Sequence, residues 1–115
     1  MEAVIEQNDG VQVIMVPGDH LDAGNAREFK EALLEQLQPG TLAVLDLSAV
    51  DFVDSSGLGV FLSTLRYLKD GGGDLALCSP RKPVRSLLEL VRLQKVFNIY
   101  ANRTDALQAL RKSAN

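Results

Sequence analysis

The residues of this chain most able to do chemistry are a carboxylate, two hydroxyls and a glycine in the run Asp54-Ser55-Ser56-Gly57. They follow an apolar run at 42–47 and open an amphipathic segment that reaches about Lys69. A buried strand would therefore deliver Ser55 to the start of a helix, where backbone N–H groups and the helix dipole favour negative charge. A serine in that place either caps the helix or accepts a phosphate that is read by another protein. The residues alone leave both interpretations open.

The single histidine is the second candidate for chemistry. His20 lies in the run Gly18-Asp19-His20-Leu21-Asp22, so a Ser-His-Asp triad would have to use it. The serine run lacks the preceding glycine of a nucleophile elbow, so we expect no enzyme and a solvated loop histidine. One histidine, one cysteine and scattered acids give no metal-ligand spacing, and no glycine-rich nucleotide loop is present, so no metal or cofactor is expected. Asp22 is expected to cap the first helix.

Composition limits the classes of partner. The chain has 115 residues, 46% of them hydrophobic and 23% charged, which is typical of one globular domain spanning 1–115. A net charge of −3 argues against nucleic acid, because the basic cluster around Arg81, Lys82 and Arg85 is small. No apolar run of about 18 residues and no signal peptide is visible, so we expect a cytoplasmic protein without a membrane partner. The only cysteine, Cys78, ends an apolar run and is expected to be a buried structural thiol.

The elements that must position these residues begin with a hairpin. Two runs rich in β-branched residues, 3–6 and 11–16, flank Asn8-Asp9-Gly10, and Asp-Gly suits a turn that needs positive φ angles. Apolar residues recur at helical spacing between Asp22 and Leu37, where Pro39-Gly40 ends the pattern.

The rest of the chain alternates between strands and helices. The run 41–47 is apolar on both faces apart from Asp46, as in a central parallel strand, and is followed by a helix at 56–69 and a strand at 75–78. A third helix is expected to bury Val84, Leu87, Leu88 and Val91, before a possible short strand at 96–100 and a last helix at 104–112. This order predicts a single α/β domain, with a mixed, mostly parallel sheet of about five strands and about four helices.

Two motifs carry a resemblance to a known family. The segment from Asp46 to Gly59, with its core Asp-Ser-Ser-Gly-Leu-Gly, resembles the signature of the STAS-domain anti-sigma factor antagonists of bacteria. The run from Gly18 to Asp22 is similar to the glycine-x-leucine-aspartate loop of that family, and the element order and length also match. The chain departs from the pattern at Arg92, where many relatives have a glycine before leucine.

The resemblance implies an adaptor and not a catalyst. Such proteins bind an anti-sigma factor, itself a serine kinase of the histidine-kinase-like ATPase fold, and so free a sigma factor. Ser55 would be the phosphoacceptor, and a PP2C-type phosphatase would reverse the modification. The partner-binding residues implied are Asp19, His20, Asp22, Asp54, Ser55, Ser56, Gly57 and Leu58.

Three further expectations accompany this interpretation. Phosphate at a helix start should change the fold little, because free N–H groups receive it. The free protein is expected to be a monomer. The alternative function is a STAS subunit of another bacterial complex, in stress sensing, lipid transport or secretion control, that acts by constitutive protein contact.

Overall fold

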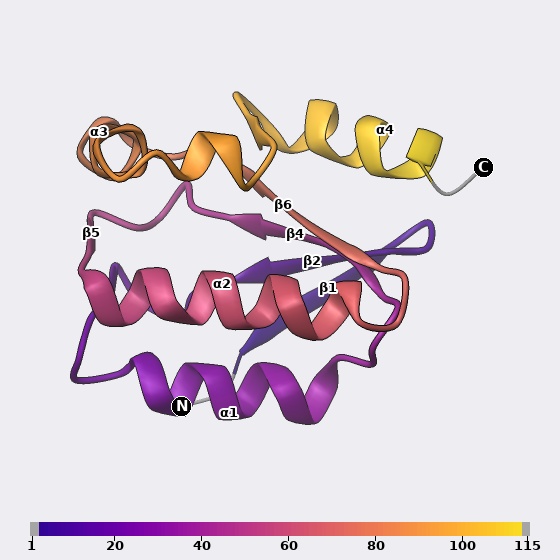
Figure 1. Ribbon diagram of the computed structural model, residues 1–115, viewed down its shortest axis with the longest axis horizontal. Helices are drawn as coiled ribbons and strands as arrows, with labels where there is room; N and C mark the ends of the chain where they lie inside the picture. The colour runs from indigo at the N-terminus through magenta and orange to yellow at the C-terminus, as the bar shows by residue number, and fades with distance from the viewer. Residues whose placement is uncertain (1–2, 114–115) are drawn as a thin grey trace.

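The computed structural model describes residues 3–113 and shows a five-stranded sheet with helices on both sides (Figure 1). In spatial order the strands are β1 (Val4–Asn8), β2 (Val11–Met15), β4 (Leu42–Asp46), β6 (Asp74–Cys78) and β7 (Ile99–Tyr100). The helices are α1 (Ala26–Gln36), α2 (Ser55–Lys69), α3 (Lys82–Leu90) and α4 (Arg103–Ser113), with a short 3-10 helix η1 (Leu93–Lys95). Only β1 runs antiparallel to its neighbour, so the predicted mixed, mostly parallel sheet is confirmed.

The N-terminal hairpin forms as the Asp-Gly pair predicts. Asp9 and Gly10 both have positive φ, +49° and +84°, which is the backbone of the turn that matches the twist of two antiparallel strands. The register then pairs Asn8 with Val11 and Val4 with Met15. The second strand of this hairpin pairs in parallel with β4, which brings the hairpin into the main sheet.

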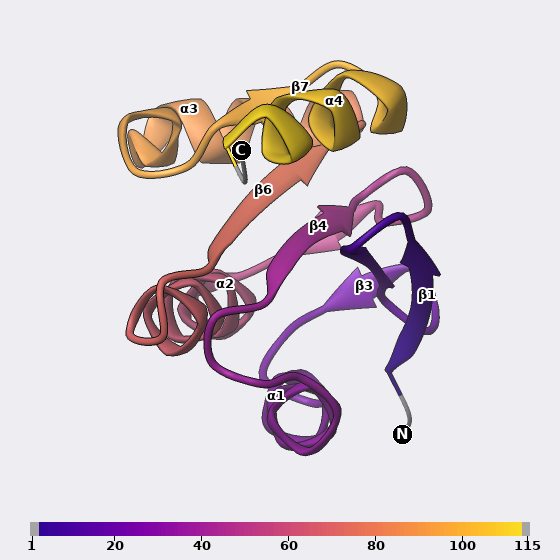
Figure 2. The ribbon, with the colours of Figure 1, turned by 90° about the vertical axis from the view of Figure 1, so that its right-hand side faces the viewer.

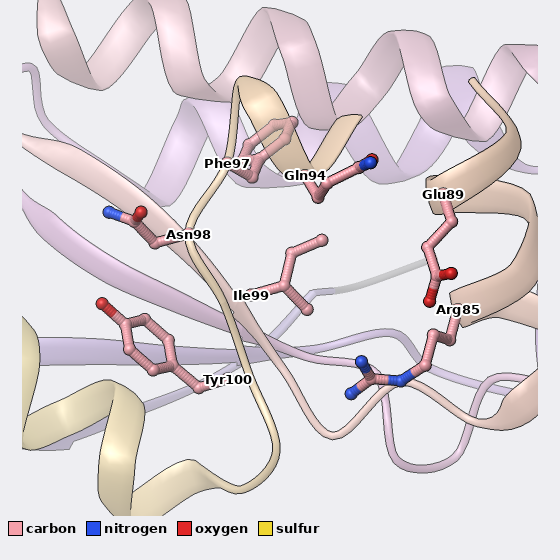
Figure 3. A pocket seen from close by; sticks show the side chains of 7 residues that line it. All are labelled: Arg85, Glu89, Gln94, Phe97, Asn98, Ile99 and Tyr100. Atoms are coloured by element: carbon pink, nitrogen blue, oxygen red, sulfur yellow. The ribbon is translucent and has the colours of Figure 1, made fainter. Parts of the chain in front are cut away.

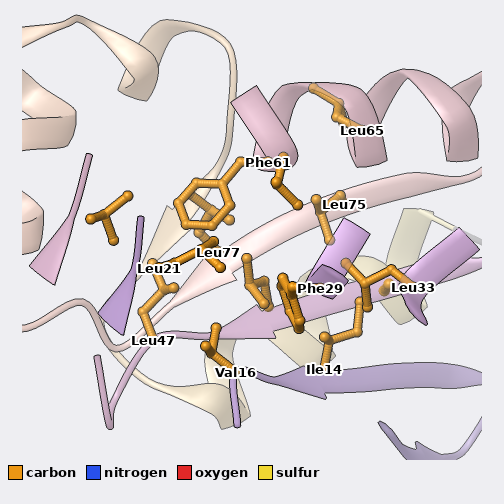
Figure 4. Close-up of a cluster of buried hydrophobic side chains, with 14 of the residues drawn as sticks. Ile14, Val16, Leu21, Phe29, Leu33, Leu47, Phe61, Leu65, Leu75 and Leu77 are labelled. Carbon is orange, nitrogen blue, oxygen red and sulfur yellow. The ribbon is translucent and has the colours of Figure 1, made fainter. Parts of the chain in front are cut away.

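The two faces of the sheet bury different clusters. Alternate residues of the central strands, such as Ile14, Leu45 and Leu77, point toward α1 and α2, where Phe29 and Phe61 fill the larger core (Figure 4). The intervening residues point toward α4 and form the smaller cluster, which consists of Val11, Val13, Val44, Ala76, Cys78, Ala106, Leu107 and Leu110. Figure 2 shows α1 and α2 on one side of the strands and α4 on the other.

A buried ion pair joins α4 to the sheet. Asp46, at the end of β4, is 7% exposed, and Arg103 donates to its Oδ2 from Nε at 3.1 Å and from Nη2 at 2.8 Å. Burial alone would raise the pKa of Asp46, but the Ser48 N–H and the Arg103 guanidinium outweigh it and hold this pKa below its usual range. Arg103 also pairs with Glu6 of β1, so a single side chain ties three elements together.

Helix α1 begins later than the sequence pattern predicts. It starts at Ala26, and Asp22 does not cap it, so the expectation for Asp22 was wrong. The Asp22 carbonyl accepts from the N–H groups of Asn25 and Ala26, while its side chain accepts from the Gly24 N–H at 2.9 Å. Asp22 therefore closes a turn of its own, because aspartate competes for nearby backbone donors outside a helix.

The expected inner face of α3 is wrong at its end. Val84 and Leu88 are buried, but Val91 is 44% exposed because the helix stops at Leu90. Arg92 stops it by adopting a left-handed backbone conformation with φ +61°. The following strand is also shorter than expected and spans only Ile99–Tyr100.

Cys78 is buried, as expected. It lies on the α4 face of the sheet, where burial raises the pKa of its thiol to about 11. The thiol therefore stays protonated at neutral pH, which suits packing and not reactivity.

Candidate functional site

Asp54 is the residue that begins α2 and organises the candidate site. Its Oδ1 accepts from the N–H groups of Ser56 at 2.8 Å and Gly57 at 3.2 Å, which is a helix N-cap. Ser55 is the first residue of the helix and is exposed, as is Ser56. The carboxylate therefore caps the helix, and Ser55 presents its hydroxyl to solvent.

The second oxygen of Asp54 reaches a segment more than thirty residues earlier in the chain. Oδ2 accepts from the Ala23 N–H at 3.1 Å, and the Asp54 N–H donates to the Leu21 carbonyl at 3.2 Å. These bonds extend a small parallel sheet of β3 (His20–Leu21) and β5 (Phe52–Val53). No sequence pattern indicated this pair of strands, which holds the 18–22 segment beside the serines.

Gly57 lets the two segments approach closely. A Cβ at this position would lie 2.6 Å from the Leu21 carbonyl oxygen and 2.8 Å from Val53 Cγ1, closer than real Cβ atoms approach. Leu21 is in turn fixed, because its side chain is fully buried among the core residues of Figure 4. The close approach of α2 to β3 therefore requires glycine at residue 57.

The 18–22 segment is shaped by Asn25, a residue that sequence reasoning missed. Its Oδ1 accepts from the Asp22 N–H at 2.9 Å and its Nδ2 donates to the His20 carbonyl at 2.9 Å. The signal was present as an aspartate and an asparagine three residues apart, a spacing common in side-chain-closed turns. His20 and Asp22 are consequently held in fixed positions beside Asp54.

The imidazole of His20 faces solvent and bonds to Asp19. Nδ1 lies 3.1 Å from Asp19 Oδ1, and this hydrogen bond raises the pKa of His20 and lowers that of Asp19. Leu58 differs from the other predicted contact residues, because it is half-buried and packs against the core. Of the eight residues predicted for partner contact, Asp19, His20, Ser55 and Ser56 are the exposed ones, whereas Gly57 is buried.

Arg81 and Asp51 complete the surroundings of the site, and neither was predicted. The Asp51 N–H donates to the Asp19 carbonyl at 2.7 Å, and its carboxylate pairs with the Arg81 guanidinium. Arg81 also donates from Nε to the Ser48 carbonyl at 2.6 Å. Arg81 is the residue that immediately precedes α3, so the start of that helix is tied to the 18–22 segment.

The surface of the described part of the chain is hollowed beside Ser56 and beside α3. Among residues 3–113, no group of three His, Cys, Asp or Glu side chains could hold a metal ion. A groove of about 380 Å³ runs between α1 and α2 beside Ser56, lined mainly by small residues. A second hollow, of about 470 Å³, lies away from Ser55 between α3, η1 and β7 (Figure 3). No helix in the described part of the chain is long and apolar enough to cross a membrane.

Comparison with known protein families identifies the family of this chain. The model of the STAS domain matches residues 2–106. The chain belongs to the STAS domain family. Its fold is thus the one the two sequence motifs implied.

Relatives of this STAS domain carry regulatory names. It is 32% identical over 112 residues to the anti-sigma F factor antagonist of Paenibacillus polymyxa, covering 96% of this chain and 95% of the relative. It is 27% identical to the anti-sigma-B factor antagonist of Bacillus subtilis, covering 90% and 94%. The crystal structure of an anti-sigma factor antagonist from Mycobacterium paratuberculosis superposes with a TM-score of 0.83 at 32% identity, covering 95% and 92%. All three relatives are named as anti-sigma factor antagonists.

Proposed function

We propose that this STAS domain is an anti-sigma factor antagonist that works by partner switching in the cytoplasm. Unphosphorylated, it binds an anti-sigma factor that is also a serine kinase of the histidine-kinase-like ATPase fold, and so releases a sigma factor. Transfer of the γ-phosphoryl group of ATP to Ser55 ends this binding, and a PP2C-type phosphatase restores it. The names and full-length coverage of the relatives support the proposal. The observation that carries it is the exposed Ser55 hydroxyl at the start of α2.

The physical basis of the switch differs from the sequence expectation in one respect. The N–H groups of Ser56 and Gly57 are not free to receive a phosphate, because the Asp54 carboxylate already accepts from both. A phosphate on Ser55 adds about −1.5 to −2 charges beside this carboxylate and must remain hydrated at the surface. A partner that fits a neutral hydroxyl would have to remove water from this dianion without compensation, so binding is lost while the fold persists.

The contact surface in this proposal has two parts. Asp19, His20 and Asp22 lie on one side, and Asp54, Ser55 and Ser56 lie on the other, joined by the β3–β5 pair. Gly57 and Leu58 act indirectly, Gly57 by permitting the close approach of the two segments and Leu58 by anchoring the first turn of α2 in the core.

The test is intact-mass spectrometry after incubation with ATP and the serine kinase encoded nearest to this protein, followed by site mapping. We expect one phosphate on wild type and on the matched control Ser56→Ala, and none on Ser55→Ala. In a binding assay Ser55→Ala should retain the kinase, whereas Ser55→Asp should bind it weakly. Equal binding by wild type and Ser55→Asp, or kinase binding without any phosphate, would instead support a STAS subunit that acts by constitutive contact.

A further inference from the structure

A group of exposed apolar side chains lies at the end of α3 and around η1. Leu90 is 79% exposed, Val91 44% and Val96 50%, all within seven consecutive residues. The buried side of this segment is formed by other residues, namely Val84, Leu88, Leu93 and Phe97. Single exposed apolar residues are ordinary, but a group of large ones on a soluble domain usually marks a contact surface.

The segment that contains these residues is also rich in positive charge. Residues 81–95 hold five basic side chains and one acidic one, which leaves seven basic and fourteen acidic residues in the rest of the chain. Arg81 pairs with Asp51, but Arg85, Arg92 and Lys95 form no ion pair with any residue in 3–113. Two cations without acidic partners, Arg92 and Lys95, therefore lie within the same run of residues as the exposed apolar side chains. We call Leu90, Val91, Arg92, Lys95 and Val96 the α3–η1 surface.

The backbone at Arg92 is an independent observation on this surface. Its φ of +61° and ψ of +32° lie in the left-handed region, which glycine adopts freely and a long side chain does not. Strain of this kind persists where the surrounding structure imposes it, and it gathers at sites of function. Arg92 follows Val91 directly and precedes the 3-10 helix, so its charge belongs to the same short segment as the apolar group.

Helix geometry separates this surface from the hollow of Figure 3. Arg85 and Glu89 lie one turn apart on α3 and both line that hollow, with Gln94 of η1 opposite them. Leu90 lies about 180° from the buried side of α3, since Leu88 is two residues earlier and each residue turns the helix by about 100°. Leu90 therefore points away from the core, and Val91 and Val96, which follow it in the chain, are about half exposed.

We propose that the α3–η1 surface docks an acidic amphipathic helix of a partner protein. The apolar side of that helix would cover Leu90, Val91 and Val96, while its carboxylates would face Arg92 and Lys95. An anionic membrane fits less well, because a flat bilayer would also face the net charge of −7 on the remainder of the chain. The proposal goes beyond the Ser55 switch and does not rest on it.

The experiment uses a synthetic helical peptide with leucines at i, i+3, i+4 and i+7 and glutamates elsewhere, titrated into the ¹⁵N-labelled protein and followed by NMR. We expect shifts confined to residues 85–97 and affinity that falls as salt is raised. Leu90→Ser and Arg92→Gly should each weaken binding by roughly fivefold. Arg92→Gly is the more decisive variant, because glycine adopts the left-handed turn without strain and should preserve the fold. Weaker peptide binding by Arg92→Gly would therefore result from the loss of the arginine side chain.

Matched controls test location and independence. Val4→Ser removes an apolar side chain of β1 that is 46% exposed, close to the exposure of Val91 and Val96, and Arg27→Ala removes an exposed charge from α1; neither should change the affinity. Ser55→Asp should bind the peptide like wild type, which separates this surface from the switch. Equal binding of a scrambled peptide, or no binding up to about 1 mM, would overturn the proposal. So would sedimentation with phosphatidylglycerol vesicles in place of peptide binding, or a dimer that Leu90→Ser dissociates.

Discussion

The two glycines of α2, Gly57 and Gly59, should respond oppositely to substitution by alanine. A Cβ at Gly57 would meet the Leu21 carbonyl oxygen at 2.6 Å and Val53 Cγ1 at 2.8 Å, whereas a Cβ at Gly59 would meet nothing within 4 Å. Both residues lie in one helix, so they share the propensity term that favours alanine over glycine by about 1 kcal/mol in a helix interior. The difference between them isolates the close approach of α2 to β3.

The size of the effect follows from these distances. Ordinary contact begins at 3.4 Å, so Gly57→Ala must separate the helix from the Leu21 backbone by about 0.8 Å, the difference between 3.4 and 2.6 Å. Overpacking of this kind costs about 1–3 kcal/mol, and the Asp54–Leu21 hydrogen bond of 3.2 Å is strained with it. We expect the free energy of unfolding to fall by about 2 kcal/mol in Gly57→Ala and to rise by about 0.5–1 kcal/mol in Gly59→Ala.

Urea unfolding followed by circular dichroism measures this difference. With an m-value of about 1.5 kcal/mol/M, the two variants should have midpoints about 2 M apart and equal m-values. The reasoning is refuted if Gly57→Ala unfolds at the same urea concentration as wild type, or at a higher one. An altered m-value in Gly57→Ala would point to a change in the unfolded state instead.

Three other predictions concern charged groups. Asp54→Ala should lower the free energy of unfolding by about 2 kcal/mol, because it loses the helix cap and the hydrogen bond from the Ala23 N–H. Asp54→Asn should lower it by about half as much. Two variants as stable as wild type would contradict this prediction. Arg103→Ala should cost about 2 kcal/mol at pH 7 by leaving Asp46 buried without its cation. Because the pKa of Asp46 is lowered in the folded state, the stabilisation by its carboxylate is present above pH 4 and is lost as pH falls further. The destabilisation caused by Arg103→Ala should therefore be smaller near pH 3. Urea unfolding at both pH values measures this difference. The NMR titration midpoint of His20 should lie above 6.5 and fall in Asp19→Asn; an unchanged midpoint would exclude their hydrogen bond.

The sequence predicted those parts of the fold that depend on local chemistry. The Asp9-Gly10 turn needs only its own residues to adopt positive φ, and the residues 43–45 are buried because they are apolar. The β3–β5 pair could not be predicted, since two-residue strands carry no alternation and their pairing joins residues about thirty positions apart. The end of α3 was missed because an arginine, and not a glycine, adopts the left-handed turn.

The candidate site likewise has features that the local sequence predicts and features that depend on tertiary contacts. Strand-to-helix position and residue type were enough to place Asp54 and Ser55 at the start of α2. The bond from the Ala23 N–H to Asp54 and the orienting role of Asn25 depend on tertiary geometry that no local pattern contains. The Leu21 carbonyl, whose close approach requires glycine at residue 57, lies far earlier in the chain, so no local pattern could identify it.

The hydrogen bonds that join residues 19–23 to residues 51–54, just before α2, have a consequence for motion. The amide protons of Asp51, Ala23 and Asp54 are each held by an acceptor on the opposite segment, so none can exchange with solvent unless the two segments part. Hydrogen exchange should therefore release these three amides at one common rate, as a single cooperative opening smaller than global unfolding. A ligand that contacts both segments would slow the exchange of all three amide protons together. Their exchange rates would therefore report ligand binding without any label on the ligand.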